Sequence, residues 1–312
     1  MMLTARLFIR KHLKHYACAV LLVFCGATAQ GQQIPDPTFD PKVARPAFTN
    51  KHPKVLFDEA HNNFHTAGGR YKAFADLITN DGFMVIPGRQ KFSRENLKGY
   101  DILLISNALG SPDLGTPEAN QSAFSEEECD AVREWVRAGG ALLIIADHYP
   151  VGGATGNLAG RFGVEMSNAF TEDQSHLDKE LQTELFSREN GLLLDHPITR
   201  GRGAGERVER VVTFTGQSLK GPADSFAFMK LGDTAVDRMP PDRSKTVSAA
   251  GRAQGLALKF GKGRVVVMGE AAMLTAQLAG PQRVKFGGLN LPGIDNRQLA
   301  LNIMRWLSKV LN

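Results

Sequence analysis

The hydrophobic positions of this chain fall into short continuous runs, which are separated by stretches with one apolar and one polar side. The runs predict five buried strands, at residues 54–58, 83–86, 101–105, 141–146 and 264–268. Apolar residues at consecutive positions, as at 141–146, are typical of strands that are buried on both faces of a parallel sheet.

Amphipathic patterns between these runs predict helices. They lie from Gly69 to Asn80, from Ser125 to Arg137, at about 271–278, and after Asp295. Ser125 and Glu128 form the S-x-x-E pattern of a capping box. The alternation of strands and helices predicts an α/β fold: a flavodoxin-like, doubly wound, mostly parallel sheet with helices on both faces and an inserted region.

The regular alternation is lost between about residues 151 and 262, which we interpret as an elaboration of the core. This region contains a predicted glycine-rich mobile loop over the site (Gly152, Gly153, Gly156 and Gly160), an acidic segment at 172–184, and a predicted strand at 211–218. Ahead of the first strand, the proline-rich residues 30–53 predict an extended linker. The predicted domain therefore spans residues 54–312.

The first 29 residues have the pattern of a secretory signal peptide. A basic segment precedes a short apolar run that closes on Ala27-Thr28-Ala29. A membrane-spanning helix needs about 20 apolar residues, so we expect no stable membrane anchor after cleavage. The predicted location is secreted or periplasmic. Only Cys129 remains in the mature chain, where we expect it in the core, on the apolar side of its helix.

The net charge gives no support for nucleic acid binding. The formal net charge is +5, but four basic residues and no acidic ones lie within residues 1–29. Removing them leaves +1, so the basic character belongs largely to the targeting segment. We expect no nucleic acid partner.

Polar side chains follow four of the predicted strands at their carboxyl ends. In an open α/β sheet ligands bind outside these ends, so we expect the groups to converge. The expected catalytic groups are Glu59, His61, Asp147, His148 and Glu270. The expected binding groups are Asp58, Asn62, Asn107 and Gln217. Adjacent strand residues point to opposite faces, which favours Glu59 over Asp58 as the neighbour of His61 in the cleft.

Acids and imidazoles in one cleft support three kinds of chemistry. They can act as general acid and base, they can ligate a divalent metal through His61, Asp147 and His148, or they can hydrogen-bond a small molecule or glycan. No cofactor is firmly implied. Each residue alone also has a structural interpretation, such as Glu270 stabilising a helix N-terminus.

Several familiar motifs are absent or incomplete. Asp58-Glu59-Ala60-His61 spells a helicase box, but no phosphate-binding loop accompanies it. His61 and His65 lack the H-E-x-x-H order of zinc proteases, and the glycines at 152–160 do not form G-x-G-x-x-G. The chain also has no G-x-S-x-G nucleophile elbow.

A family resemblance rests on six segments. They are residues 55–61, 100–105, 124–128, 139–147, 263–270 and 295–302. Together they resemble the class I glutamine amidotransferase-like superfamily, and in particular a secreted branch similar to the domain of gliding-motility and intraflagellar-transport proteins. The resemblance implies a flavodoxin-like fold. Members with amidotransferase activity carry a catalytic cysteine at the turn that here is Ala146-Asp147-His148-Tyr149, so Cys-dependent glutaminase chemistry is not expected.

Two classes of function remain open. One is a secreted hydrolase that uses the Asp/Glu/His cleft. The other is a non-catalytic module that binds a glycan or a protein with the same groups. Strongly shifted pKa values in the cleft would favour the enzyme, and widely separated Asp and His groups would favour the binding module.

Overall fold

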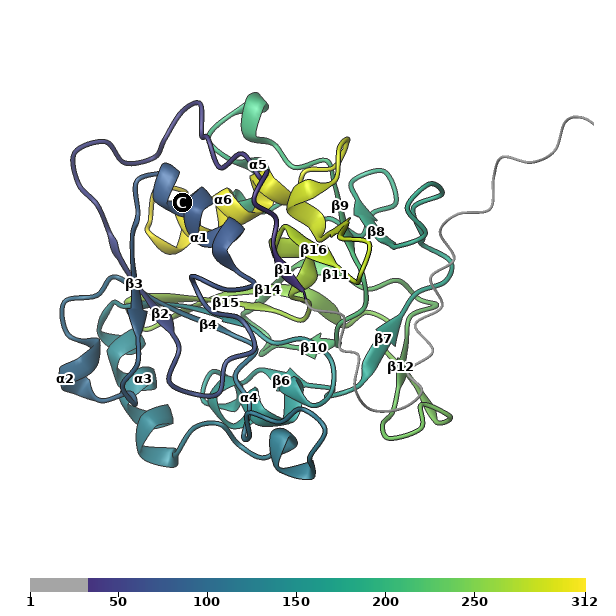
Figure 1. The fold of residues 1–312 in the computed structure, drawn as a ribbon, viewed down its shortest axis with the longest axis horizontal. Coiled ribbons are helices and arrows are strands. Elements are labelled where there is room, and N and C mark those ends of the chain that lie inside the picture. The colour runs from purple at the N-terminus through teal and green to yellow at the C-terminus, as the bar shows by residue number, and fades with distance from the viewer. Residues whose placement is uncertain (1–32) are drawn as a thin grey trace, which may run out of the picture. The chain divides into compact units, whose positions relative to one another are not determined.

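The computed structural model describes residues 33–312, so the predicted signal peptide lies outside the described residues. A nine-stranded sheet runs in the order β3-β2-β4-β5-β15-β14-β10-β6, and β11 also pairs with β14 (Figure 1). The last four of these strands are β14 (Ala253–Phe260), β10 (Leu219–Lys220), β6 (Glu165–Met166) and β11 (Phe226–Lys230). Its five adjacent parallel strands are β3 (Met84–Gly88), β2 (Lys54–Asp58), β4 (Ile102–Ser106), β5 (Ala141–Ile145) and β15 (Gly263–Met268). In chain order this is 2-1-3-4-5, the flavodoxin-like order. All five predicted strands are confirmed to within two residues.

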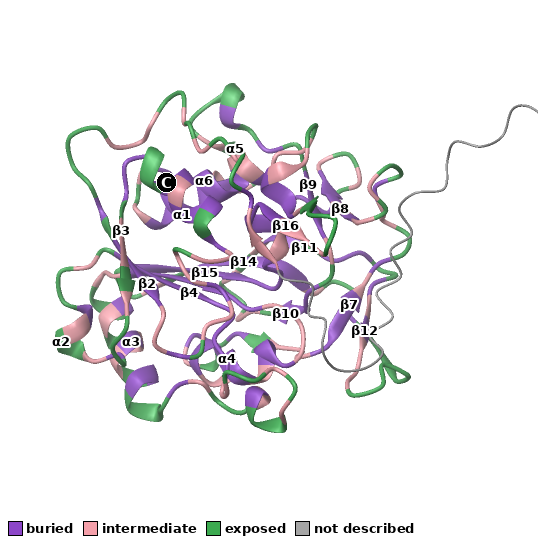
Figure 2. Ribbon diagram, viewed as in Figure 1, coloured by how far each residue is buried: buried purple, intermediate pink, exposed green. Residues whose placement is uncertain are grey.

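The continuous apolar runs are buried on both faces of this sheet. In β4, Ile102 and Leu104 join one hydrophobic core, while Leu103 and Ile105 join the other. This follows from the pleat, which points successive side chains to opposite faces. Figure 2 shows the central strands buried between two layers.

Helices lie on both sides of the sheet (Figure 1). On one side are α1 (Lys72–Asn80), the short α5 (Pro197–Arg200) and α6 (Asn296–Leu307), and on the other are α2 (Arg94–Leu97), α3 (Glu126–Ala138) and α4 (Val151–Gly160). The capping box of α3 is confirmed, because Ser125 accepts from the Glu128 amide and Glu128 accepts from the Ser125 amide. Cys129 is fully buried, and burial raises its pKa to about 12.

The glycine-rich segment is a helix, so the prediction of a loop there is wrong. Close packing explains why glycine is required at the start of α4. A Cβ on Gly152 would lie 2.3 Å from Oε1 of Gln217, and one on Gly153 would lie 2.1 Å from Oδ1 of Asn120. Tertiary contacts therefore outweigh the poor helix propensity of glycine.

The predicted helix at 271–278 is also wrong. A single 3-10 turn, η3 (Ala272–Leu274), is followed by the strand β16 (Gln277–Ala279). β16 pairs on one side with β1 (Ile34–Pro35) and on the other with β17 (Val284–Phe286). Strand pairing with distant residues decides this segment, which a local pattern cannot show.

The described part of the expected linker, residues 33–53, is mostly irregular and lies packed on the domain. β1 adds a strand to β16, and Phe48 packs against the core with its ring centroid 5.1 Å from that of Phe83. Arg297 of α6 also donates to the carbonyls of Asp40 and Lys42. These contacts hold the segment along the helical layer.

The region 151–262 adds short strands to the core. β6 (Glu165–Met166), β10 (Leu219–Lys220), β11 (Phe226–Lys230) and β14 (Ala253–Phe260) extend the central sheet. A second sheet contains β7 (Phe170–Glu172), β12 (Val236–Arg238) and β13 (Thr246–Ser248), and β8 (Glu184–Ser187) pairs with β9 (Arg210–Thr213). The strand expected at 211–218 thus ends at Thr213. Short 3-10 turns are η1 (Pro117–Asn120), η2 (Ala204–Glu206) and η4 (Gly288–Asn290).

None of the helices within residues 33–312 combines the length and the apolar character that crossing a bilayer requires.

Candidate functional site

The loops after β2 and β4 meet at the carboxyl edge of the sheet. The chain goes from β2 to β3 on one side and through β4 to β5 on the other, so this is the switch point where α/β sheets bind ligands. The two loops are joined by backbone hydrogen bonds from Phe64 to Asn107 and from Leu109 to His61. The first group of predicted site residues lies here.

His61 is held between two buried carboxylates. Its Nδ1 lies 2.8 Å from Oδ1 of Asp58, and its Nε2 lies 2.8 Å from Oε1 of Glu128. The ring also packs between Phe92 and Phe124, with both centroid distances at 4.6 Å. Burial opposes the charged ring, but the hydrogen bonds and charges of the two carboxylates raise the pKa of His61. With both nitrogens donating, the ring has no lone pair for a metal or a substrate proton.

Glu59 does not accompany His61, so that expectation is wrong. Its Oε1 accepts from the amide of Ala67 at 3.0 Å, and its Oε2 lies 3.4 Å from Nε of Arg89. Glu59 therefore fastens the loop after β2 and reaches toward the end of β3. Asp58 contacts His61 instead, because strand alternation ends where the chain turns.

The predicted binding amides also bridge parts of the chain. Asn62 donates to the carbonyl of Leu109 at 3.2 Å, and Asn107 accepts from the amide of Asp147 at 3.0 Å. Both asparagines have positive φ, 48° and 45°, a conformation that asparagine tolerates better than most residues. These contacts tie the loop after β2 to the end of β4, and the end of β4 to the turn after β5.

Gln217 is fully buried, and both ends of its amide bond to backbone groups. Its Nε2 donates to the carbonyls of Ala146 and Asp147, and its Oε1 accepts from the amide of Asn168. The residue holds the turn after β5 in place. A ligand would have to break one of these bonds to contact it.

Asp147 and His148 are the predicted catalytic residues that reach solvent most. Their side chains are 17% and 34% exposed. Oδ1 of Asp147 accepts from the His148 amide at 2.8 Å, and the His148 ring lies 4.4 Å from the ring of Phe170. Nδ1 of His148 contacts the carbonyl of Tyr149, and its Nε2 lies 3.9 Å from Oδ1 of Asp147.

Glu270 is almost fully buried. Its two carboxyl oxygens accept from the amides of Ala272 and Met273 at 2.8 and 2.7 Å. Burial, and next the negative charge of Asp147, raise the pKa of Glu270 well above its ordinary value. The structure therefore brings Asp147 and Glu270 into one electrostatic neighbourhood, while His61 belongs to the separate cluster with Asp58 and Glu128.

A buried polar group that the sequence did not assign lies between these clusters. Nδ1 of His65 is 3.0 Å from Oγ of Ser106, and the His65 ring stacks on Tyr71 at 4.4 Å. Burial lowers the pKa of His65 to about 3, so the ring is neutral at physiological pH. The Tyr71 hydroxyl donates to the carbonyl of Ala271 at 2.7 Å. In the sequence, the only notable feature of His65 was that it lies four positions after His61.

A cavity of about 310 Å³ opens beyond the ends of β7 and β9. Its lining is mostly polar and comprises Thr171, Glu172, Gln174, Leu177, Gln182, Thr183, Glu184, Phe214 and Thr215. It borders the carboxyl end of β15, because Thr171 bonds to Gly216, and a Cβ on Gly216 would lie 2.8 Å from that of Glu270. We call it the carboxyl-edge pocket.

Glu184 is the most deeply buried acid of the carboxyl-edge pocket. It accepts from the amide of Asp173 at 2.8 Å and lies 3.3 Å from the hydroxyl of Thr213. Burial raises the pKa of Glu184 to about 8. The acidic segment at 172–184 was visible in the sequence, but nothing in its pattern showed which acid is buried.

The described residues contain no cluster of three His, Cys, Asp or Glu side chains arranged to hold a metal ion. Of the three proposed ligands, His61 is already bonded through both nitrogens to Asp58 and Glu128.

No protein-family model matches the chain, and no curated protein matches it. Among solved structures, the N-terminal domain of mmIFT52 is similar with a TM-score of 0.57 and 15% identity, over 81% of this chain and 97% of that one. A cytoplasmic protein from Salmonella typhimurium LT2 has a TM-score of 0.49 and 15% identity, covering 81% and 99%. A ThuA-like protein from Parabacteroides merdae has a TM-score of 0.45 and 12% identity, covering 84% and 91%.

The likeness to the mmIFT52 domain shows a shared fold and says nothing about activity. It confirms the part of the resemblance that concerns the fold: a mixed α/β domain with a mostly parallel central sheet. The reaction or ligand has to be argued from the site itself.

Proposed function

We propose that this chain is a non-catalytic module that binds a neutral, hydroxyl-rich ligand, such as a saccharide unit, in the carboxyl-edge pocket. The observation that carries the proposal is the chemistry of the lining. Hydroxyls and amides predominate, and the two acids are compensated: Glu172 pairs with Arg238 at 2.6 Å, and the raised pKa of Glu184 favours its neutral form at pH 7. Such a pocket offers hydrogen bonds without a net charge.

Two lining residues support this ligand class. The Oγ1 atom of Thr183 is buried and has no hydrogen-bond partner among the described residues. A buried hydroxyl normally has one, and rotation of the Thr183 side chain would turn this hydroxyl toward a ligand in the pocket that the residue lines. Phe214, held by a contact with Phe286 at 4.9 Å between ring centroids, offers an apolar ring next to the polar groups.

Thr183→Val tests the proposal, with Thr246→Val on the exposed strand β13 as its control. Calorimetric titration of the wild type with neutral mono- and disaccharides should identify a ligand. Thr183→Val should weaken its binding roughly three- to ten-fold, because a neutral hydrogen bond contributes about 0.5–1.5 kcal/mol. Its unfolding midpoint should not fall, since the hydroxyl has no protein partner to lose. Equal saccharide affinity in the two variants would show that Thr183 does not contact the ligand. If the wild type binds no saccharide, the proposal is wrong.

A second proposal is a hydrolase that uses Asp147, His148 and Glu270. The supporting observation is the Asp147–Glu270 pair, in which burial and the Asp147 charge raise the pKa of Glu270. A buried carboxyl with a raised pKa is a common general acid. The His148 ring, whose Nε2 lies 3.9 Å from Oδ1 of Asp147, supplies a second proton-transfer group at the solvent side.

A hydrolase substrate panel distinguishes the two proposals. Wild-type protein should hydrolyse at least one substrate, and His148→Ala should lower kcat at least about 100-fold, the usual contribution of a general acid or base. Glu59→Gln is the control, because the Glu59 side chain contacts Ala67 and Arg89 instead of the proposed catalytic residues. Full activity in His148→Ala, or none in the wild type, would remove the hydrolase and leave the binding module.

We also propose that the protein is secreted or periplasmic and belongs to the secreted amidotransferase-like branch that its sequence resembles. The support is the pattern of residues 1–29. Mass spectrometry of the exported protein should find Gln30 at its N-terminus. A chain retained in the cytoplasm with Met1 intact would contradict this.

A further inference from the structure

A second cavity, of about 540 Å³, opens at the amino edge of the parallel sheet. Its lining includes Pro53, Asp101 and Gly140, which precede β2, β4 and β5, together with Leu307 and Ser308 at the end of α6. We call it the amino-edge pocket. It lies at the opposite edge of the sheet from the residues of both proposed functions.

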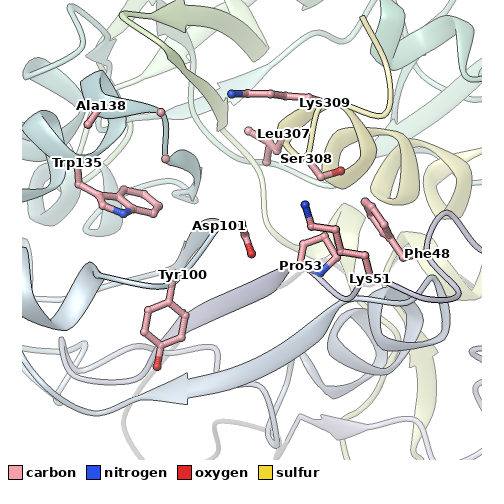
Figure 3. Close-up of a pocket in the computed structure, with 12 residues that line it drawn as sticks. Phe48, Lys51, Pro53, Tyr100, Asp101, Trp135, Ala138, Leu307, Ser308 and Lys309 are labelled. Atoms are coloured by element: carbon pink, nitrogen blue, oxygen red, sulfur yellow. The ribbon is translucent and has the colours of Figure 1, made fainter.

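Aromatic side chains form its walls. Figure 3 shows Trp135 on one side and Phe48 with Pro53 on the other. The Trp135 ring folds back over Gly140, where a Cβ would lie 2.5 Å from two ring atoms. Phe48 is held by its contact with Phe83. Both walls are therefore fixed by the protein in the absence of a ligand.

Basic side chains predominate among the charged groups of the amino-edge pocket. Lys51 extends toward the space between the aromatic walls, and Lys309 lies along another side (Figure 3). Neither ammonium group forms an ion pair within residues 33–312, although Lys309 contacts the carbonyl of Lys262 at 3.2 Å. The single acid in the lining, Asp101, accepts from the amide of Lys54 at 2.8 Å.

We propose that the amino-edge pocket binds a small aromatic carboxylate, with its ring against Trp135 and its carboxylate at Lys51. Offset or edge contacts between aromatic rings stabilise such an arrangement, and an ammonium–carboxylate hydrogen bond is stronger than a neutral one. The volume falls within the roughly 300–1,000 Å³ of ordinary small-molecule sites. This ligand differs in charge and location from the neutral ligand of the carboxyl-edge pocket.

Calorimetric titration of the full chain with 1-naphthoate tests the proposal, and the uncharged 1-naphthamide is the matched probe. Naphthoate should bind, and naphthamide should bind at least about ten-fold more weakly because it lacks the charge that pairs with Lys51. Equal affinity for the two probes would overturn the proposal. So would the absence of naphthoate binding at millimolar concentration.

Lys51→Gln places the site, with the exposed Lys91→Gln at the opposite edge as its control. Lys51→Gln should weaken naphthoate binding about ten-fold and leave naphthamide binding unchanged, because only the charged probe uses the ammonium group. Lys91→Gln should change neither. An equal loss in both lysine variants would show non-specific charge attraction and would overturn the site.

Trp135→Leu gives an independent measurement of the ring contact. It should weaken naphthoate and naphthamide binding to the same extent, because both probes carry the same ring. The protein contains two tryptophans, and Trp306 is buried, so wild-type fluorescence quenching by naphthoate reports mainly on Trp135. If Trp135→Leu does not fold, unchanged wild-type fluorescence at saturating naphthoate would still contradict the ring contact.

Discussion

The two edges of the parallel sheet use their polar residues in different ways. At the carboxyl edge, Asp58, His61 and Gln217 are buried and bonded to other parts of the chain. At the amino edge, Lys51 and Trp135 line a cavity and leave their charge and ring available. The carboxyl edge has more polar residues in the sequence, and more of their hydrogen-bonding groups are already bonded to the protein itself.

The difference follows from burial. A buried polar group without a partner costs about 1–3 kcal/mol, so folding selects partners within the chain. Exposed groups are solvated by water and are under no such pressure. Polar residues gathered at strand ends are therefore weak evidence for a ligand, and a buried group left without a protein partner, such as the hydroxyl of Thr183, is stronger evidence.

The largest expected effect is the loss of the buried cluster around His61. Glu128→Ala removes one of its two carboxylates and the capping box of α3, and should lower the free energy of unfolding by roughly 3–5 kcal/mol. Denaturant titration measures it. Its neighbour Glu127 is exposed, so Glu127→Ala should have a much smaller effect. Equal losses in the two variants would show that the cluster does not hold the carboxyl edge together.

The packing of α4 should show the next largest effect. A methyl group at Gly152 would overlap Gln217 and Asn168, so Gly152→Ala should cost about 1–3 kcal/mol. Gly156 in the same helix has open space around it, and Gly156→Ala should stabilise by about 0.5–1 kcal/mol. Thermal unfolding of both variants provides the comparison. Stabilisation by Gly152→Ala would contradict the close contact.

Glu184 should make stability depend on pH. Its pKa is about 8 in the fold, above the ordinary 4.5, so its favourable contribution is complete below pH 4.5 and is lost as the pH rises toward 8. Glu184→Gln stays neutral, and its stability relative to wild type should increase from pH 5 to pH 8, by at most about 1.4 kcal/mol per pH unit. Parallel pH profiles for the two proteins would show that Glu184 ionises normally.

The smallest effect is expected at the amino edge. Lys51 is exposed and makes no ion pair among the described residues, so Lys51→Gln should change stability by no more than about 0.5 kcal/mol. A loss as large as that of Glu128→Ala would mean that both edges are held by internal charge pairs. The same variant then serves in the binding experiment without a folding defect.

The sequence alone determined the central sheet. Continuous apolar runs such as 102–105 and 141–145 have apolar side chains on both faces of the strand, so both faces must be buried. The S-x-x-E pattern at Ser125 specifies the start of a helix through contacts between residues three positions apart. These features are local, so a local pattern predicts them. The placement of polar residues at the carboxyl ends of the strands was visible in the same way.

Only the tertiary structure decided which polar groups pair and which remain available. His61 contacts Glu128, which is 67 positions away in the sequence. Contacts with Gln217 and Asn120 require the glycines at the start of α4. Glu184 becomes buried where β8 pairs with the distant strand β9. Hydrogen bonding and burial at these sites depend on residues far apart in the chain. The sequence therefore located an edge rich in polar groups, and the fold determined that most of them bind the protein itself.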